Sequence, residues 1–305
     1  MMDPLLQECV ICPRECGVDR YKGKGFCQAG AGLEINLAQL HFGEEPPISG
    51  TRGSGTIFFC HCNLRCVYCQ NHQISLKGHG KAVSEAEAIK IMLSLQEQGA
   101  HNVNLVTPSH YAPQLVKTIS EAKRQGLKIP VLYNSSAYDK VEMLRSLEDV
   151  VDIYLPDYKY HHAIYAKKYS HAPDYPKVAQ NAIAEMIRQK GFLRLDSEGI
   201  ATQGVLVRHL VLPHMLSGSR AALQMLASEF GTRIPISLMG QYYPAAEAHR
   251  YPELKRGITE DEYQKALDVI YDLGFECVIG QELSSDDSWT PDFVYDKAAM
   301  KSQGN

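Results

Sequence analysis

The sequence of 305 residues lacks any run of about 18 apolar residues, the minimum for a helix that spans a membrane. It also lacks an excess of positive charge, because its formal net charge is −4. This charge balance offers no electrostatic basis for binding nucleic acid or an anionic membrane. The first residues show neither the basic nor the apolar region of a secretory signal, so we expect a reducing, cytoplasmic location.

Cysteine is the one residue type with an unusual count, because the chain contains nine. Disulfides are rare in reducing compartments, so metal ligands or reactive thiols are the expected alternatives. Seven of the nine fall into two groups: Cys9, Cys12, Cys16 and Cys27, and then Cys62, Cys66 and Cys69. We expect the remaining two, Cys60 and Cys277, to be packing residues in the core.

The second group has the spacing C-x3-C-x2-C and directly follows an apolar segment, GTIFF. A structural zinc site uses four ligands, so His61 or His72 would have to complete it here. Three thiolates instead leave one iron of a [4Fe–4S] cluster open to a second molecule. The spacing therefore favours a reactive iron–sulfur centre over a structural metal site.

The segment CNLRCVYCQN, with Tyr68 at its aromatic position, resembles the signature of the radical S-adenosylmethionine (SAM) superfamily. More narrowly, the chain resembles the pyruvate formate-lyase activating-enzyme-like group, in the branch with a cysteine-rich N-terminal extension. Nearly the whole chain takes part in this resemblance, which is carried by the segments CPRECGVDR, HFGEEPPISG, GSGTIFF, NLVTPSHYAP, DIYLPDYKY and VRHLVLP.

The resemblance implies that Cys62, Cys66 and Cys69 hold a [4Fe–4S] cluster that binds SAM and cleaves it reductively. The resulting 5′-deoxyadenosyl radical abstracts hydrogen from a substrate, and a glycyl residue of a partner enzyme is one candidate. A radical SAM enzyme acting on a small molecule or on another macromolecule is the alternative, and a non-catalytic iron–sulfur or zinc protein is a third. We expect a low-potential electron donor such as flavodoxin or ferredoxin.

Strand patterns occur at 56–59, 103–106, 129–133, 152–155, 205–212 and 235–239. Helical patterns lie between them, and the first opens with a capping box formed by Ser84 and Glu87. Six such units predict an α/β fold, a partial (βα)6 barrel, because a closed barrel needs eight. We expect a loop-rich, metal-bound segment over 1–50, the barrel over 51–285 and a tail over 286–305.

The four cysteines of the first group could form a complete tetrahedral thiolate set. Structural zinc is one interpretation, since a segment that is rich in Gly and Pro needs a metal to fix it. An auxiliary [4Fe–4S] cluster, with a thiolate on each of its four irons, is the other.

Polar residues follow the predicted strands, at the edge where parallel sheets bind ligands. From the resemblance and from these positions, the candidate cofactor contacts are Tyr68, Asn71, Thr107, Ser109, Asn134, Asp157, Lys159 and Arg208. Asp157 and Lys159 point the same way from an extended chain and suit a zwitterionic amino-acid group, although an internal ion pair is the alternative.

His110 lies where the superfamily usually has a Gly-Gly-Glu-like element, which this sequence lacks. A histidine at the end of a strand can serve as a catalytic group or as a structural turn residue. We treat His110 as the candidate catalytic residue peculiar to this branch.

Overall fold

The computed structural model describes residues 3–281, 283, 290, 291 and 293. A large sheet contains eight strands in the order β3 (Lys81–Val83), β1 (Leu33–His41), β2 (Ser54–Phe59), β4 (Val103–Val106), β5 (Val131–Ser135), β6 (Ile153–Pro156), β8 (Ala201–Val205) and β7 (Arg194–Leu195). A smaller parallel sheet contains β9 (Val207–Leu210), β10 (Ile236–Met239) and β11 (Val278–Gly280). The two sheets meet where Asp157 and Arg208 form a parallel bridge.

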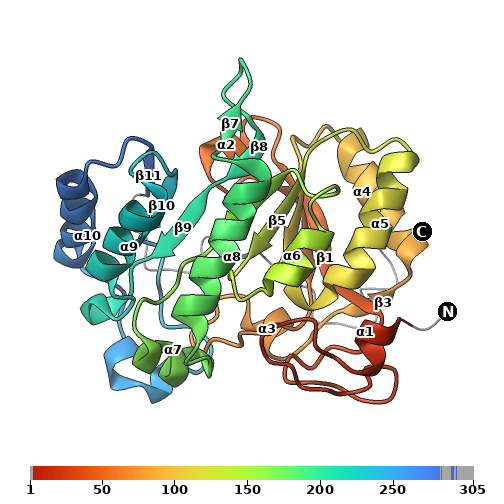
Figure 1. Ribbon diagram of the computed structural model, residues 1–305, viewed down its shortest axis with the longest axis horizontal. Helices are drawn as coiled ribbons and strands as arrows, with labels where there is room; N and C mark the ends of the chain where they lie inside the picture. The colour runs from red at the N-terminus through yellow and green to blue at the C-terminus, as the bar shows by residue number, and fades with distance from the viewer. Residues whose placement is uncertain (1–2, 282, 284–289, 292, 294–305) are drawn as a thin grey trace.

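Helices follow the parallel strands and cover their outer face (Figure 1). They are α4 (Glu85–Glu97), α5 (Ala112–Arg124), α6 (Val141–Ser146), α8 (Tyr175–Lys190), α9 (Ser219–Phe230) and α10 (Glu260–Leu273). The predicted capping box of Ser84 and Glu87 opens α4. Six βα units around a curved parallel sheet confirm the predicted partial barrel.

The predicted fifth strand, 205–212, is two strands that belong to different sheets. β8 pairs with β6 and with the hairpin strand β7, whereas β9 pairs with β10. Gly204 has a φ of 117°, and a Cβ there would lie 2.3 Å from the carbonyl oxygen of Phe192. Only glycine permits this close backbone approach, which lies within β8. The two sheets separate two residues later, between Val205 of β8 and Val207 of β9.

Residues 33–41 lie in the part that we expected to be loop-dominated, but they form β1, which pairs antiparallel with β2. Because β1 is antiparallel to the other central strands, its carboxyl end lies beside their amino ends. The loop after β1 and α2 (Pro46–Ser49) therefore lie at the amino ends of the parallel strands. Figure 1 shows α2 at the opposite end of the sheet from α3 (His72–Ser75), which follows the cysteine loop. The alternation of Leu33, Ile35 and Leu37 with polar residues was a signal for this strand.

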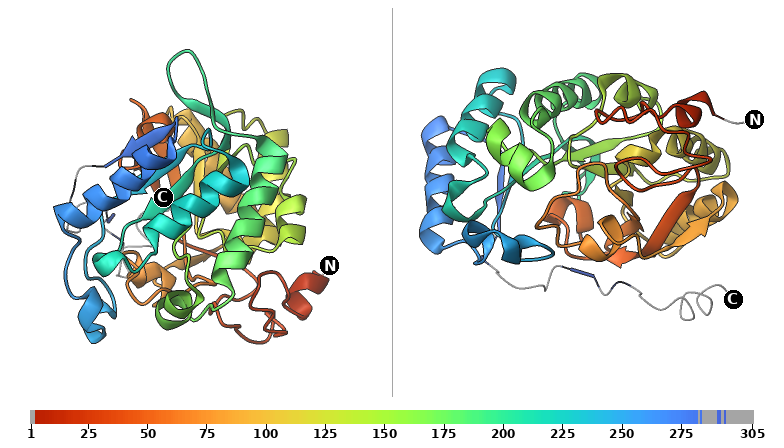
Figure 2. Two further views of the ribbon diagram at one scale, coloured as in Figure 1. Left: turned by 60° about the vertical axis from the view of Figure 1, so that its left-hand side comes forward. Right: turned by 90° about the horizontal axis from the view of Figure 1, so that it is seen from below.

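The N-terminal segment before β1 contains the short helix α1 (Pro4–Gln7) and turns, and it packs on the barrel helices. Asp3 forms an ion pair with Lys117 of α5 at 2.9 Å, and Gln114 of α5 donates to the Ala31 carbonyl at 2.8 Å. In the view from below, this segment and the chain after β2 lie at one end of the molecule (Figure 2).

Most of the predicted tail over 286–305 lies outside the described residues. Of its described residues, Phe293 is buried and packs edge-on against Phe58 of β2, with ring centroids 5.4 Å apart. No helix within the described ranges is long and apolar enough to cross a membrane.

Candidate cluster and SAM site

A pocket of about 530 Å³ opens at the carboxyl ends of the parallel strands. Its lining includes Thr107 after β4, Ser136 after β5 and Lys159 after β6. The volume lies within the range of roughly 300–1,000 Å³ that is usual for small-ligand sites. The pocket therefore occupies the place that the strand pattern predicted for a ligand.

Three thiols, those of Cys62, Cys66 and Cys69, line this pocket together. Burial, together with the neighbouring Cys66 thiol, raises the pKa of Cys62 to about 11. Burial also raises the pKa of Cys66 to about 11, although the Lys159 ammonium opposes this effect. Thiols with such pKa values are protonated at neutral pH, so metal binding here releases protons.

Hydrogen-bond donors surround the three sulfur atoms. The Leu64 amide donates to Cys62 Sγ at 3.3 Å, the Ser75 hydroxyl donates to Cys69 Sγ at 3.1 Å, and the Ser170 hydroxyl donates to Cys66 Sγ at 3.1 Å. Such donors stabilise thiolates and tune iron–sulfur clusters. Three donor-supported thiols that face one pocket fit a [4Fe–4S] cluster with one open iron.

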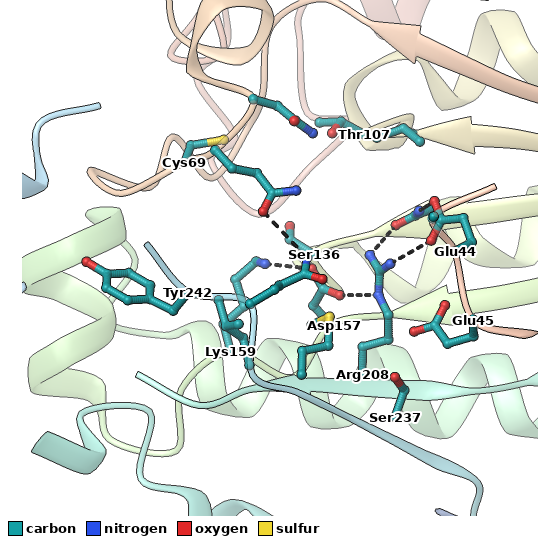
Figure 3. Close-up of a pocket in the computed structure, with 18 of the residues that line it drawn as sticks. Glu44, Glu45, Cys69, Thr107, Ser136, Asp157, Lys159, Arg208, Ser237 and Tyr242 are labelled. Carbon is teal, nitrogen blue, oxygen red and sulfur yellow. Dashed lines mark hydrogen bonds and ion pairs between the residues drawn. The ribbon is translucent and has the colours of Figure 1, made fainter. Parts of the chain in front are cut away.

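Asp157 and Lys159 both line the pocket, and they also form the ion pair that was the alternative interpretation. Lys159 Nζ lies 2.5 Å from Asp157 Oδ2, and Arg208 Nε donates to Asp157 Oδ1 at 2.7 Å (Figure 3). Burial raises the pKa of Asp157, but Arg208 and Lys159 outweigh it and hold this pKa below its usual value. The carboxylate is therefore ionised at neutral pH and fixes both cations.

Glu44, from the loop after β1, was not anticipated as a site residue. Figure 3 shows Arg208 between Glu44 and Asp157. Arg208 NH1 lies 3.1 Å from Glu44 Oε2, and its NH2 donates to Asn134 Oδ1 at 2.6 Å. The Asn104 amide also donates to Glu44, at 2.9 Å. Asn134 and Arg208 thus line the pocket, but they are hydrogen-bonded to each other. The Glu44 carboxylate accepts from both side chains and holds them in place.

Asn71 and Tyr68 lie on the cluster side of the pocket. Asn71 precedes α3 without making a side-chain capping bond, and its buried Oδ1 has no hydrogen-bond partner among the described residues. That oxygen is thus available to a ligand, which argues against an ordinary turn bond. Tyr68 packs edge-on against Tyr242, with ring centroids 5.7 Å apart, and forms part of the wall.

Of the residues after β4, only Thr107 lines the pocket. Thr107 has a φ of 60°, and the chain then turns away through a short 3-10 helix (Ser109–Tyr111). Ser109 consequently bonds Asp139 instead of a ligand. The expectation that Ser109 contacts the cofactor is therefore not met by its position.

His110 is buried and lies outside the residues that line the pocket. Burial lowers its pKa well below the usual value, so the ring is neutral. Its Nε2 donates to the carbonyl oxygen of Cys60 at 2.9 Å. The position of His110 thus favours the structural alternative, in which the ring supports the chain at Cys60, two residues before Cys62.

The N-terminal cysteines are close neighbours. Burial raises the pKa of Cys9, and the Cys16 and Cys27 thiols raise it further. Cys9, Cys12 and Cys27 are buried, whereas Cys16 is exposed. Within the described ranges, no three His, Cys, Asp or Glu side chains converge as ligands of a single metal ion do.

The two remaining cysteines differ from each other. Cys60 is buried in the core, as expected. The expectation for Cys277 is wrong, because this side chain is exposed. It immediately precedes β11, an edge strand whose residues are themselves largely exposed.

Comparisons with known proteins agree with this geometry. A family model of the radical SAM superfamily matches residues 56–192. The uncharacterized protein MJ0674 of Methanocaldococcus jannaschii is 30% identical over 285 residues, which cover 88% of this chain and 78% of that protein.

One similar solved structure supports the fold, and a second aligns less well. Methylornithine synthase (PylB) aligns with a TM-score of 0.50 and 12% identity over 76% of this chain and 73% of its own. HydG, a maturase of the FeFe-hydrogenase, aligns with a TM-score of 0.47 and 17% identity over 71% of this chain. The chain spans about half of HydG, because the alignment covers 48% of that protein. From the family model, the relative and the cysteine geometry together, we conclude that this chain belongs to the radical SAM superfamily.

Proposed function

We propose that this chain is an enzyme that binds SAM at a [4Fe–4S] cluster held by Cys62, Cys66 and Cys69, and that it abstracts hydrogen from a substrate. When bound, the cluster supplies the electron that cleaves SAM to methionine and a 5′-deoxyadenosyl radical. The observation that carries this proposal is that three cysteines line one pocket beside a buried ammonium and carboxylate.

The chain's own residues position SAM in this proposal. Lys159 and Asp157 offer a cation and an acceptor to the methionine end, next to Cys66. The unpartnered Asn71 oxygen and the Thr107 hydroxyl offer further contacts at the same wall. Tyr68 and Tyr242 form an apolar boundary that restricts water.

The substrate that we favour is a glycyl residue of a partner enzyme. SAM takes up much of a pocket of about 530 Å³, so only a small substrate group can reach it. A glycyl residue carries no side chain and is therefore small enough. The resemblance to activating enzymes also favours a glycyl substrate. A small-molecule substrate or a different macromolecular target is the alternative, and a flavodoxin or ferredoxin is the electron donor that this chemistry needs.

The first test is formation of 5′-deoxyadenosine by anaerobically reconstituted protein with SAM and dithionite. Cys66→Ala is expected to abolish formation, whereas Cys277→Ala, at the exposed cysteine outside the pocket, is expected to preserve it. Wild-type rates in the Cys66→Ala variant would contradict the proposal.

The second test identifies the substrate. A candidate partner is labelled with α-deuterated glycine, and 5′-deoxyadenosine from the reaction is examined by mass spectrometry. Deuterium transfer supports the glycyl substrate. Transfer from a labelled small-molecule extract, with none from the protein, supports the alternative.

A further inference from the structure

The N-terminal cysteines share a backbone pattern with the pocket cysteines. At Cys9, Cys12 and Cys27, the backbone amide two residues later donates to the sulfur, at 3.5 Å in the last case. The same donation occurs at Cys62 and Cys69. Because a thiolate accepts hydrogen bonds far better than a thiol does, this pattern suits metal-bound sulfur.

Two arginines of the same segment, the half-buried Arg14 and the buried Arg20, form no direct ion pair among the described residues, although Glu34 acts on Arg20 from a greater distance. Arg20 is buried, and its guanidinium donates to the carbonyl oxygens of Gly30 and His110, at 2.9 and 2.5 Å. Arg14 also donates to carbonyl oxygens, and among the described ion pairs neither arginine has a carboxylate partner. Buried charges are normally paired. Four thiolates on a doubly positive cluster core carry two negative charges, which the two arginines balance.

The four thiols lie near one another. The Cys16 and Cys27 thiols both act on Cys9, and the Cys9 and Cys27 thiols both act on Cys12. As at the pocket cysteines, no three ligands in the described part of the chain converge on a single point. Four thiolates complete a [4Fe–4S] cluster, with one on each iron.

Arg14 joins this segment directly to the loop that carries the pocket cysteines. Its Nε donates to the Asn63 carbonyl at 2.9 Å, and its NH2 donates to the Leu64 carbonyl at 3.3 Å and the Ser170 carbonyl at 2.8 Å. Its guanidinium also stacks 3.9 Å from the ring centroid of Phe26, next to Cys27. Asn63 and Leu64 lie between Cys62 and Cys66, so Arg14 holds the backbone of the loop itself.

Arg20 reaches the other end of that loop through one intermediate residue. It donates to the His110 carbonyl, and the His110 ring donates to the Cys60 carbonyl. Cys60 lies two residues before Cys62. The two arginines therefore support the loop on both sides of Cys62.

We propose that Cys9, Cys12, Cys16 and Cys27 ligate an auxiliary [4Fe–4S] cluster, and that this cluster orders Arg14 and Arg20 so that they fix the geometry of the pocket cysteine loop. The assignment of the auxiliary cluster depends only on the four N-terminal cysteines and their neighbours. The effect on the pocket loop rests on the proposed function, in which the pocket cysteines hold a cluster that binds SAM.

The auxiliary site is tested by metal content, without any activity measurement. The triple variant Cys62→Ala, Cys66→Ala, Cys69→Ala, purified anaerobically after iron–sulfur reconstitution, is expected to retain about four irons per chain. Adding Cys12→Ser and Cys27→Ser is expected to remove them. About one zinc per chain, or no metal, in the triple variant overturns the auxiliary cluster.

The link to the pocket is tested with Arg14→Gln and Arg14→Lys in the otherwise wild-type chain. We expect both to keep the auxiliary irons and to change the electron paramagnetic resonance spectrum of the SAM-bound, reduced pocket cluster. 5′-Deoxyadenosine formation should fall by about 10-fold, as for supporting residues at other metal sites. Lysine is expected to rescue little, because one ammonium cannot match a planar guanidinium that donates to several carbonyls.

Arg220→Gln, at an exposed arginine of α9, is the matched control and should give the wild-type spectrum. A wild-type spectrum and rate in Arg14→Gln overturn the link between the two sites. Failure of the proposed function gives a different result from failure of this link. In that case the wild-type protein would release no 5′-deoxyadenosine, while the metal contents stay as expected.

Discussion

His209 lies beside the pocket arginine in sequence but faces the helices. Its Nδ1 donates to the Tyr158 carbonyl at 2.7 Å, and its Nε2 accepts from the Ser219 hydroxyl at 3.0 Å. Burial lowers the pKa of His209 to about 4. The usual value is about 6.5, so between these two values the unfolded chain binds a proton that the folded chain rejects. The stability of the fold therefore falls as pH drops through this window.

We predict that His209→Gln removes this pH dependence. Between pH 7 and pH 5 the wild-type free energy of unfolding should lose about 2 kcal/mol through His209, and the variant should not. Urea unfolding of the metal-free proteins at the two pH values measures the difference. If wild type and variant differ in free energy of unfolding by the same amount at pH 7 and pH 5, His209 titrates normally in the folded state.

Local spacing in the sequence was enough to predict Cys62, Cys66 and Cys69 as one group, and the structure places them in one pocket. Ser170 could not be predicted, because its bond to Cys66 joins residues 104 positions apart. Glu44 was missed for the same reason, since it meets Arg208 from 164 positions away. Such contacts depend on the folded arrangement of several elements and leave no local pattern.

At the level of elements, the predicted helices and most parallel strands follow from their periodicity and caps. The split between β8 and β9 did not, because 205–212 is continuously apolar apart from Arg208 and His209 and reads as one buried strand. The β7–β8 hairpin extends beyond the end of the sheet (Figure 1). The close approach of Gly204 to Phe192 depends on the folded chain and leaves no mark on the apolar pattern.

We predict that Gly204→Ala destabilises the fold by about 3–5 kcal/mol, because it adds both backbone strain and a clash with Phe192. Gly199→Ala, in the hairpin turn, is the matched control. Gly199 also has a positive φ, 79°, but a Cβ there meets nothing within 4 Å. It should cost only about 1–2 kcal/mol. Denaturant unfolding of both variants tests this, and equal losses would show that Phe192 does not restrict the bend.

At the scale of the whole molecule, the pocket brings together parts of the chain that are far apart in sequence. Its lining runs from His41, the last residue of β1, to Pro291 near the C-terminus, and it includes residues of both sheets. A ligand in this pocket would lie against residues of several strands and of both sheets. Its binding energy therefore stabilises the fold as a unit and not one loop alone.

We predict that SAM raises the melting temperature of the anaerobically reconstituted protein. At a SAM concentration of about 100 times Kd, the gain is about 2.7 kcal/mol, which corresponds to a shift of roughly 4 °C for a chain of 305 residues. Differential scanning fluorimetry under nitrogen measures it. Cys66→Ala, which cannot hold the complete cluster, should show a much smaller shift, and an equal shift would place the SAM contacts elsewhere.

The contacts of Arg14 also constrain the order in which the protein is assembled. Arg14 donates to the carbonyl of Asn63, 49 positions away, and to that of His171, 157 positions away. Contacts between residues so distant in sequence form late in folding, after the intervening chain has collapsed. During synthesis, the pocket loop leaves the ribosome long before residue 171 does. The loop therefore reaches its final shape only when more than half of the chain has emerged, and cluster insertion into the finished site is a late event in the maturation of the protein.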